Sequence, residues 1–398
     1  MVAVGGRLVS SQYDPLGEDT LDDPFAQYRA LREGCPVHHF EGFSPPFFTL
    51  SRYEDVLAAL KDHATFSYRH GPSPQFTRPS GLVDDPPGHT EFRRLFNRAF
   101  SPRTIAALEP TVTAIAETLV DSFVERGSGD LHDLYAVPLP ITVIARLLGL
   151  PDDDIAGFKQ MSDDLTATYN DPDPLASAEP RSRFDRYFAE FVDARRRSPT
   201  DDLVSGFVTA QLQGRPLTDD EICWMLLLLL LGGNETTTAL LTNMLWRLLE
   251  VPGRWNAVRA DPLLFDRVIE ESLRHDPPVL GMFRTTTGDI ERRGVPIPRR
   301  AKVMLCYGAA NHDPDVFADP DCFRLDRAPD EAARHLAFGF GDHYCPGSAL
   351  ARLEARVTLR LFVDRLPQLR ARWDPAPRPP RITPFLLWGR AHLPAAWD

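Results

Sequence analysis

Lysine is scarce in this chain of 398 residues, because Lys61, Lys159 and Lys302 are its only lysines among 44 basic residues. Acidic residues number 56, so the formal net charge is −12 and the isoelectric point is near 5.4. Nucleic-acid-binding proteins usually carry a basic patch and a high isoelectric point. The charge balance therefore argues against a nucleic-acid partner.

The sequence also has no long apolar run and no signal-peptide pattern in its first residues. The longest apolar run, residues 222–231, has ten residues, whereas a membrane-spanning helix needs about twenty. The start of the chain has neither a basic segment followed by an apolar core nor a twin-arginine signal. We therefore expect a soluble protein with no membrane partner.

Cysteine occurs five times, which is an odd number. The spacings form neither a zinc motif nor a disulfide framework. A reducing cytoplasm is the simplest location for such a protein. The five positions are Cys35, Cys223, Cys306, Cys322 and Cys345.

Helical periodicity dominates what is present. Amphipathic runs fill residues 89–274, and a helix is also predicted at 53–61. Strand-like stretches occur at 37–40, 47–50 and 289–305, the last with a turn at Gly294-Val295-Pro296. Residues 66–88 read as a long loop, and loops of that length are usually functional or disordered. The predicted class is mainly α with small β-sheets.

The segment Phe338-Gly339-Phe340-Gly341-Asp342-His343-Tyr344-Cys345-Pro346-Gly347 places one cysteine in a glycine-rich loop before a predicted helix at 348–366. Glycines let a loop curl around a sulfur and turn backbone N–H groups toward it. The positive end of the following helix is expected to lower the thiol pKa. The loop thus suits a thiolate that binds haem iron. The alternative is a small buried hydrophobic residue in a turn.

The spacing of Phe338, Gly341, Cys345 and Gly347, with His343 inside it, resembles the haem-binding loop of the cytochrome P450 family. The resemblance implies that Cys345 is the axial ligand of haem b and that Phe338 and Gly347 belong to the cofactor-binding loop. It extends along the chain and implies one catalytic domain over residues 1–398. In that fold, haem lies between a helix-rich lobe and a smaller strand-rich region.

A second motif lies in a long predicted helix that begins at the capping box of Thr218 and Glu221. Gly232 and Gly233 each cost a helix interior about 1 kcal/mol relative to alanine. Such a local conflict indicates either a site or a small-residue notch for packing. The run is similar to the family's Ala/Gly-Gly-x-Asp/Glu-Thr signature. The resemblance implies that the helix bends over the haem at Gly233 and that Glu235 and Thr236 relay protons.

Glu271 and Arg274 are three residues apart on a predicted helix, so they can form an ion pair. Alone, this spacing carries little information. The resemblance implies a buried structural pair whose third partner comes from a later segment. Relatives often carry arginine where this chain has Cys322, and either Arg324 or Arg327 could replace it.

Four basic residues are implied to bind the two haem propionates. His89 and Arg93 are four residues apart on a predicted helix, and hence on one face. Arg284 follows an apolar run at 279–283, and His343 lies in the cysteine loop. Charge-assisted hydrogen bonds suit this role. Each residue taken alone could be an ordinary surface basic residue.

The resemblance implies a monooxygenase that inserts one oxygen atom of O2 into a small molecule and reduces the other to water. The chain has no flavin or iron–sulfur segment, so a ferredoxin or flavodoxin is the expected electron donor. Its docking face is expected to be basic, although each of these arginines could equally lie on a solvated helix face. The candidate residues are Arg94, Arg98, Arg103, Arg352 and Arg356.

The substrate is expected to be hydrophobic, because the positions that correspond to the family's substrate pocket are apolar or small. Modification of a natural product is expected by analogy with bacterial relatives. Besides the 66–88 loop, the expected lining residues are Leu229, Gly232, Val279, Leu280, Met282, Phe283, Phe385 and Leu386.

Three alternatives remain open from the sequence. The first is a haem-thiolate enzyme that couples substrates oxidatively without inserting oxygen, although the Glu235–Thr236 pair favours ordinary oxygen activation. The second is a haem-binding sensor or carrier, which would not need that pair. The third is a cysteine hydrolase that uses Cys345 and His343, for which no orienting residue is evident.

Overall fold

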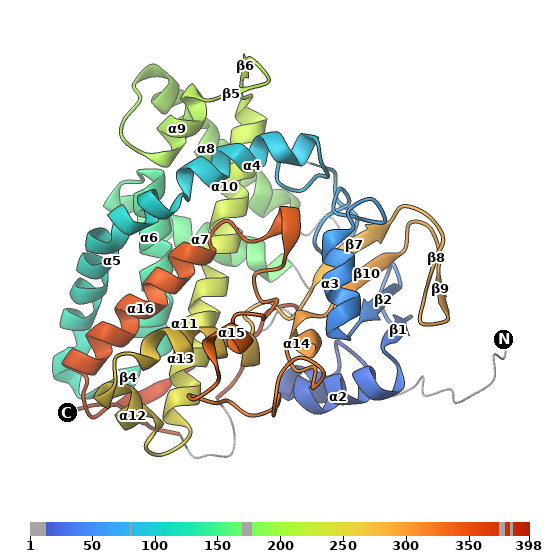
Figure 1. The fold of residues 1–398 in the computed structure, drawn as a ribbon. Coiled ribbons are helices and arrows are strands. Elements are labelled where there is room, and N and C mark those ends of the chain that lie inside the picture. Colours follow the sequence, from blue (N-terminus) through green and yellow to red (C-terminus); the bar gives the residue numbers. More distant parts are fainter. Residues whose placement is uncertain (1–12, 80, 169–176, 374–378, 383–384) are drawn as a thin grey trace.

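The computed structural model describes residues 13–79, 81–168, 177–373, 379–382 and 385–398. Helices fill most of the molecule, and the largest sheet lies on one side of them, near the N-terminus (Figure 1). The predicted class, mainly α with small sheets, is confirmed. The helices are α1 (Glu18–Asp22), α2 (Pro24–Gly34), α3 (Tyr53–Lys61), α4 (Gly88–Ala99), α5 (Pro102–Phe123), α6 (Pro138–Leu148), α7 (Ile155–Ala167), α8 (Ala178–Arg197), α9 (Leu203–Thr209), α10 (Asp219–Gly233), α11 (Glu235–Leu249), α12 (Arg254–Ala260), α13 (Leu264–His275), α14 (Tyr307–Ala310), α15 (Pro329–Ala332) and α16 (Ser348–Arg365).

The five-stranded sheet has the order β1-β2-β10-β7-β3. Strand β10 runs parallel to β2, and the other pairs are antiparallel. A three-stranded sheet has the order β11-β12-β4, and β5-β6 and β8-β9 form two-stranded ribbons. The strands are β1 (Val37–Phe40), β2 (Phe47–Leu50), β3 (Phe66–Ser67), β4 (Ser128–Asp130), β5 (Gln211–Leu212), β6 (Arg215–Pro216), β7 (Met282–Thr286), β8 (Ile290–Arg292), β9 (Val295–Ile297), β10 (Lys302–Leu305), β11 (Arg370–Ala371) and β12 (Pro394–Ala396).

Two consecutive helices, α10 and α11, run through the middle of the molecule. Thr218 and Glu221 form both bonds of the predicted capping box at the start of α10. The helix is interrupted at Asn234, where the backbone hydrogen bond from Asn234 N–H to Leu230 O is long, at 3.4 Å. The Thr236 hydroxyl donates to Gly232 O over 2.6 Å. Such a bond to a carbonyl one turn back bends helices, as the sequence suggested for this segment.

Taken together, residues 219–249 are long and apolar enough to cross a membrane. The ten-residue apolar run at 222–231 is therefore only one part of a longer apolar stretch. Within its most apolar window, however, 67% is buried inside the protein, which is the arrangement of a core helix. This stretch is therefore weak support for a membrane span.

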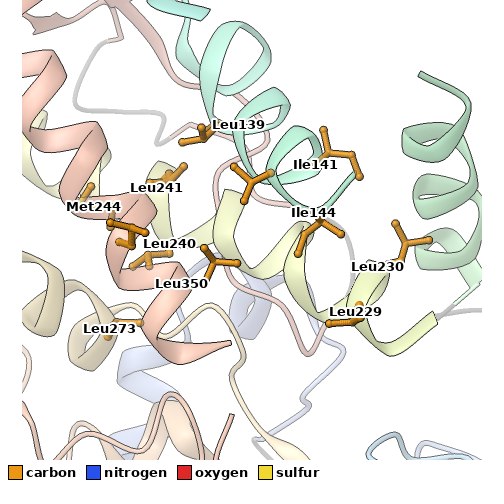
Figure 2. Packing of buried hydrophobic residues seen from close by; sticks show 14 of the residues in the cluster. Leu139, Ile141, Ile144, Leu229, Leu230, Leu240, Leu241, Met244, Leu273 and Leu350 are labelled. Atoms are coloured by element: carbon orange, nitrogen blue, oxygen red, sulfur yellow. The ribbon is translucent and has the colours of Figure 1, made fainter. Parts of the chain in front are cut away.

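The central core lies where α10 and α11 meet α6 and α16 (Figure 2). Ile144 of α6, Leu240 of α11 and Leu350 of α16 are each buried there. Gly233 permits the close approach of α6, because a Cβ atom at that position would lie 2.7 Å from Ile144 Cδ1. The packing notch and the candidate site therefore coincide at this glycine.

Two local predictions needed correction. Strand β4 and the β5-β6 ribbon both interrupt the stretch that was expected to be helical. Strand β4 pairs with β12, whose residues come more than 260 positions later. The turn between β8 and β9 is formed by Arg293 and Gly294, both with positive φ. Val295 and Pro296, assigned to the turn, belong to β9.

Candidate functional site

The loop before α16 wraps around Cys345. The Cys345 N–H donates to Phe338 O over 2.9 Å. Gly339 and Gly341 both adopt φ of +71°, a conformation that side chains disfavour. Gly347 has an ordinary φ of −81°, but a Cβ there would lie 3.8 Å from the Cys345 sulfur. That distance is an ordinary van der Waals contact, and Cys345 and Gly347 both line a cavity.

The thiol pKa differs from the sequence expectation. Burial raises the pKa of Cys345 above its usual range, although hydrogen bonding from the Gly347 backbone and the charge of Arg93 act in the opposite direction. The helix end contributes as expected, but desolvation outweighs it. A stable thiolate at this position therefore needs a further positive charge beside the sulfur.

A cavity of about 260 Å³ opens directly above Cys345. Phe338 and Gly347 line it from the cysteine loop, and Gly233 and Thr236 line it from the broken helix. The remaining wall is mostly aliphatic or aromatic, with Ile144 among its residues. Motifs that are more than a hundred residues apart in the sequence thus enclose one space.

All four predicted anion-binding residues line this cavity: His89, Arg93, Arg284 and His343. The rings of His89 and His343 lie 4.2 Å apart between centroids. Burial, followed by the charges of Arg284 and His89, lowers the pKa of His343 to about 2. Its Nε2 is buried and has no hydrogen-bond partner among the described residues. A cofactor that carries carboxylates would satisfy this cluster, and a thiolate-bound iron would supply the positive charge missing at Cys345.

Tyr68 belongs to the same cluster and was not singled out from the sequence. The Arg284 guanidinium lies 4.2 Å from the centroid of its ring, and His343 lies 4.5 Å away on a tilted plane. Burial raises the Tyr68 pKa to about 12, so its hydroxyl is neutral. The only sequence signal was its place in the long 66–88 loop, which did not distinguish it from its neighbours.

Glu235 and Thr236, the two residues predicted to relay protons, lie in different environments. Thr236 lines the cavity, whereas Glu235 is absent from the described lining and accepts a 3.3 Å hydrogen bond from Asn234 Nδ2. Burial raises the pKa of Glu235, and the charge of Lys159 opposes this shift. The carboxyl therefore faces α7 and not the open space.

The predicted substrate-lining residues also divide. Leu229, Gly232, Val279 and Met282 line the cavity. Phe283 does not, because side chains alternate along β7 and its ring packs edge-on against Phe47 at 5.0 Å. The remaining expected residues outside the described lining are Leu280, Phe385 and Leu386.

The Glu271–Arg274 pair is fully buried. Arg274 donates to both oxygens of Glu271, over 2.8 and 2.9 Å. Arg327 adds a third guanidinium bond at 2.8 Å, whereas Arg324 contributes only its backbone N–H. Of the two candidates left open, Arg327 is therefore the charged partner.

Most of the expected docking arginines are already paired. Arg94 contacts Glu91, Arg352 contacts Glu270, and Arg356 contacts Asp266. Arg98 and Arg103 are exposed and form no ion pair with the described part of the chain. The free positive charge on this face is thus smaller than the sequence suggested.

The family model described as Cytochrome P450 matches residues 176–369. Erythromycin C-12 hydroxylase of Saccharopolyspora erythraea is 38% identical over 86% of this chain and 87% of its own length. Cytochrome P450 107B1 of the same organism is 36% identical, over 89% and 92%. The structure of the bacillaene polyketide synthase cytochrome P450 PksS of Bacillus subtilis 168 superposes with a TM-score of 0.88, 30% identity, and coverage of 97% of this chain and 100% of that one.

Proposed function

This chain belongs to the cytochrome P450 family, and on that premise we propose that Cys345 is the axial thiolate of its haem b and that the enzyme hydroxylates a hydrophobic small molecule in natural-product biosynthesis. The protein is a haem-thiolate monooxygenase, an oxidoreductase that uses O2 and electrons from a separate protein. The observation that carries the residue assignment is that Cys345 lines a cavity in which, among the described residues, the charged side chains other than Glu354 are basic.

Four basic residues would hold the haem carboxylates. His89, Arg93, Arg284 and His343 line the same cavity, and in the described part of the chain the buried Nε2 of His343 has no hydrogen-bond partner. The charge on a propionate would offset the mutual repulsion of these groups. When bound, thiolate-ligated haem supplies the activation of O2.

The polypeptide would supply protons and exclude water. The Thr236 hydroxyl is placed at the cavity wall by the hydrogen bond that it donates to Gly232 O, so its oxygen can accept a hydrogen bond inside the site. Glu235, whose pKa is raised, would pass protons toward it from the α7 side. The aliphatic walls keep bulk water away from the reacting atoms.

The substrate proposal rests on the lining and on the relatives. Leu229, Val279 and Met282 present an apolar surface with few polar groups. Among the relatives, Erythromycin C-12 hydroxylase and Polyketide biosynthesis cytochrome P450 PksS are named for natural-product pathways. A hydrophobic polyketide-like molecule is therefore the proposed class of substrate.

The proposed electron donor is a ferredoxin or flavodoxin that docks on the Cys345 side. Arg98 and Arg103 are exposed and form no ion pair within the described ranges, and Phe340 and Tyr344 are exposed in the cysteine loop. Both donor classes are small and acidic, so attraction to these arginines would speed their encounter. A cytoplasmic location is part of the proposal, because all five cysteines are free thiols.

The spectrum of the reduced, carbon monoxide-bound protein tests the ligand assignment. We expect a strongly red-shifted Soret band in the purified protein and its loss in Cys345→Ser. Cys322→Ser, which changes an exposed cysteine, is the matched control and should keep the band. An unshifted band in freshly purified wild-type protein would refute the assignment.

Isotope labelling then separates hydroxylation from oxidative coupling. Turnover under 18O2 should give a product that carries one labelled oxygen atom. A product without the label would favour the coupling alternative, because coupling removes hydrogen without inserting oxygen.

A further inference from the structure

The amine of Lys302 is buried in a place that offers it no counter-ion. Lys302 is the first residue of β10 and is 1% exposed. Its Nζ donates to His70 O over 2.7 Å and to Gly71 O over 3.3 Å. Within the described ranges no carboxylate pairs with it, and a buried charge without a partner is costly. The position therefore favours a side chain that can lose its charge.

The two acceptors belong to a tight turn at residues 70–77, called the 70–77 turn below. Thr77 N–H donates to His70 O over 3.0 Å and closes the turn. Gly71 has a φ of +92°, and a Cβ atom there would collide with Thr77, so the turn requires glycine. Pro72 O accepts a 2.9 Å hydrogen bond from Phe283 N–H of β7. Three successive carbonyls thus hold the turn to β10 and β7.

Phe76, in the same turn, covers the amine. Lys302 Nζ lies 4.8 Å from the centroid of the Phe76 ring, and the His70 ring lies 5.9 Å from it. Phe76 is nevertheless 43% exposed, so the ring also meets solvent. The cover over the amine is therefore thin, and lifting the turn would hydrate the amine.

The 70–77 turn joins two parts of the cavity wall. Tyr68 precedes the turn and Leu82 follows it, and both line the cavity. Gly71 N–H donates to Tyr68 O over 3.0 Å, while the Tyr68 hydroxyl donates to Met282 Sδ over 3.7 Å. Met282 is a further lining residue. Movement of the turn would therefore move the wall of the site.

The electrostatic surroundings favour a neutral amine when the turn is closed. Burial, followed by the charge of Arg284, lowers the pKa of Lys302 from 10.5 to about 7. A neutral amine keeps two N–H donors, which matches the two carbonyl acceptors. Burial also lowers the pKa of His70, as do the charges of its basic neighbours. The charged groups that act on Lys302 or His70 are Arg69, Arg284, Arg300 and Asp85.

We propose that Lys302 is a positioning residue for substrate exchange: closing of the 70–77 turn over a bound substrate releases a proton from the Lys302 amine, and the return of that proton lets the turn lift. One N–H bond of the ammonium breaks and its proton passes to solvent water. The two remaining N–H groups hold His70 O and Gly71 O. No electron moves and no co-reactant is needed. The proposal rests on the proposed function, because it concerns access to the same cavity.

Linkage fixes the direction of the pH dependence. When the turn is lifted, the hydrated amine has its ordinary pKa of 10.5, whereas the closed turn lowers it to about 7. Between these values the lifted form binds a proton that the closed form does not, so the closed form gains as pH rises. Below about pH 7 both forms are protonated and the balance stays constant. His70, with a pKa lowered from 6.5, and Tyr68, with a pKa of about 12, titrate outside this window.

Amide hydrogen exchange in the wild-type holoenzyme tests the motion. Thr77 N–H is bonded inside the turn, so its exchange reports lifting. After correction for the intrinsic exchange rate, the peptide that contains residues 70–77 should exchange severalfold more slowly at about pH 9 than at about pH 7. In Lys302→Gln, whose neutral amide keeps two N–H donors, this difference should vanish. Equal corrected rates at both pH values in the wild type would overturn the proposal.

Ligand release tests the consequence for the cavity. The probe is 4-phenylimidazole, a bulky haem ligand, which leaves the reduced protein while carbon monoxide traps the emptied site. Wild-type release should be severalfold slower at about pH 9 than at about pH 7, and release from Lys302→Gln should not change with pH. Recombination of photolysed carbon monoxide inside the cavity is the control for effects at the haem. A pH dependence of the same size in that control would overturn the proposal.

The remaining outcomes separate Lys302 from its neighbour and from the proposed function. His70→Gln removes the nearby imidazole but keeps the backbone oxygen that Lys302 binds, so it should keep the wild-type pH dependence. Loss of the dependence in His70→Gln, or its persistence in Lys302→Gln, would overturn the proposal. Each of these results can occur with a red-shifted carbon monoxide band, which leaves the haem-thiolate assignment intact. If Lys302→Gln does not accumulate, wild-type amide exchange decides alone.

Discussion

Arg327 donates its Nε–H to Oε2 of Glu271 over 2.8 Å and thereby joins two parts of the chain that are 56 residues apart. Glu271 is also bound by Arg274, and all three side chains are at most 1% exposed. Burial raises the pKa of Glu271, but the hydrogen bonds and charge of Arg274 outweigh it, so the net shift is downward. The carboxylate is therefore ionised and holds two buried guanidinium groups.

Glu271→Ala should be strongly destabilising, because it leaves the buried Arg274 guanidinium without its carboxylate partner and leaves Arg327 paired with Glu331 alone. We expect a loss of about 3–5 kcal/mol in the free energy of unfolding, measured by urea denaturation. Arg324→Ala is the matched control, since Arg324 bonds Glu271 only through its backbone N–H. Equal losses in the two variants would contradict this account.

The two adjacent glycines of α10 should respond differently to alanine. A Cβ at Gly232 meets no atom within 4 Å, whereas one at Gly233 lies 2.7 Å from Ile144 Cδ1. Gly232→Ala should stabilise the helix by up to about 1 kcal/mol and weaken the binding of bulky ligands. Gly233→Ala should cost about 1–3 kcal/mol through overpacking. Thermal unfolding would measure the stability of both variants, and ligand titration would measure their binding. If Gly233→Ala were the more stable variant, the close packing of Gly233 against Ile144 would be contradicted.

Thr236→Ala should retain haem and the carbon monoxide spectrum but divert electrons to hydrogen peroxide, because the cavity wall loses the hydroxyl oxygen that accepts a hydrogen bond inside the site. The comparison is product formed per reducing equivalent, with peroxide measured in parallel. Thr236→Ser restores a hydroxyl that can reach Gly232 O and should recover most of the coupling. Full coupling in the alanine variant would remove Thr236 from the proposed relay.

Lys302 should make stability depend on alkaline pH. Its ammonium is buried beneath the 66–88 loop, where it donates to His70 O over 2.7 Å. Burial, together with the charge of Arg284, lowers its pKa from 10.5 to about 7. Between these values the unfolded chain binds a proton that the folded protein does not, so stability rises with pH across that window.

Lys302→Met removes this titration, so its stability should stay flatter over the same range. Urea midpoints of the two proteins at about pH 6.5, 8 and 9.5 provide the test. Below about pH 7 the difference between the urea midpoints of the wild type and Lys302→Met should become constant. Curves that remain parallel over the whole range would show that Lys302 is not buried as described.

Local sequence patterns were sufficient to predict helices and strands whose formation depends mainly on the residues within the element itself. Strands β1 and β2 and helix α3 have the predicted bounds, because apolar alternation and helical spacing are local properties. Strand β4 was missed because its pairing depends on β12, near the other end of the chain. Its own residues, Ser128, Gly129 and Asp130, have low strand propensity.

The site was predictable to the extent that motifs define backbone geometry. The four basic residues and Thr236 all line the cavity near Cys345, as the motifs suggested. Side-chain direction was less predictable. Glu235 turns toward α7, Phe283 turns toward Phe47, and Glu354 turns into the cavity. The directions of these side chains depend on tertiary packing, which cannot be predicted from a single sequence.

The parallel pairing of β2 with β10 has a consequence for the newly made chain. Phe47 lies beside Lys302 in this ladder, so 255 further residues must be synthesised after Phe47 before β2 can pair with β10. Until then, β1 and β2 present an open edge, the kind of surface that recruits other chains. Premature termination before β10 should therefore yield fragments that aggregate, even when most of the helical residues have already been synthesised.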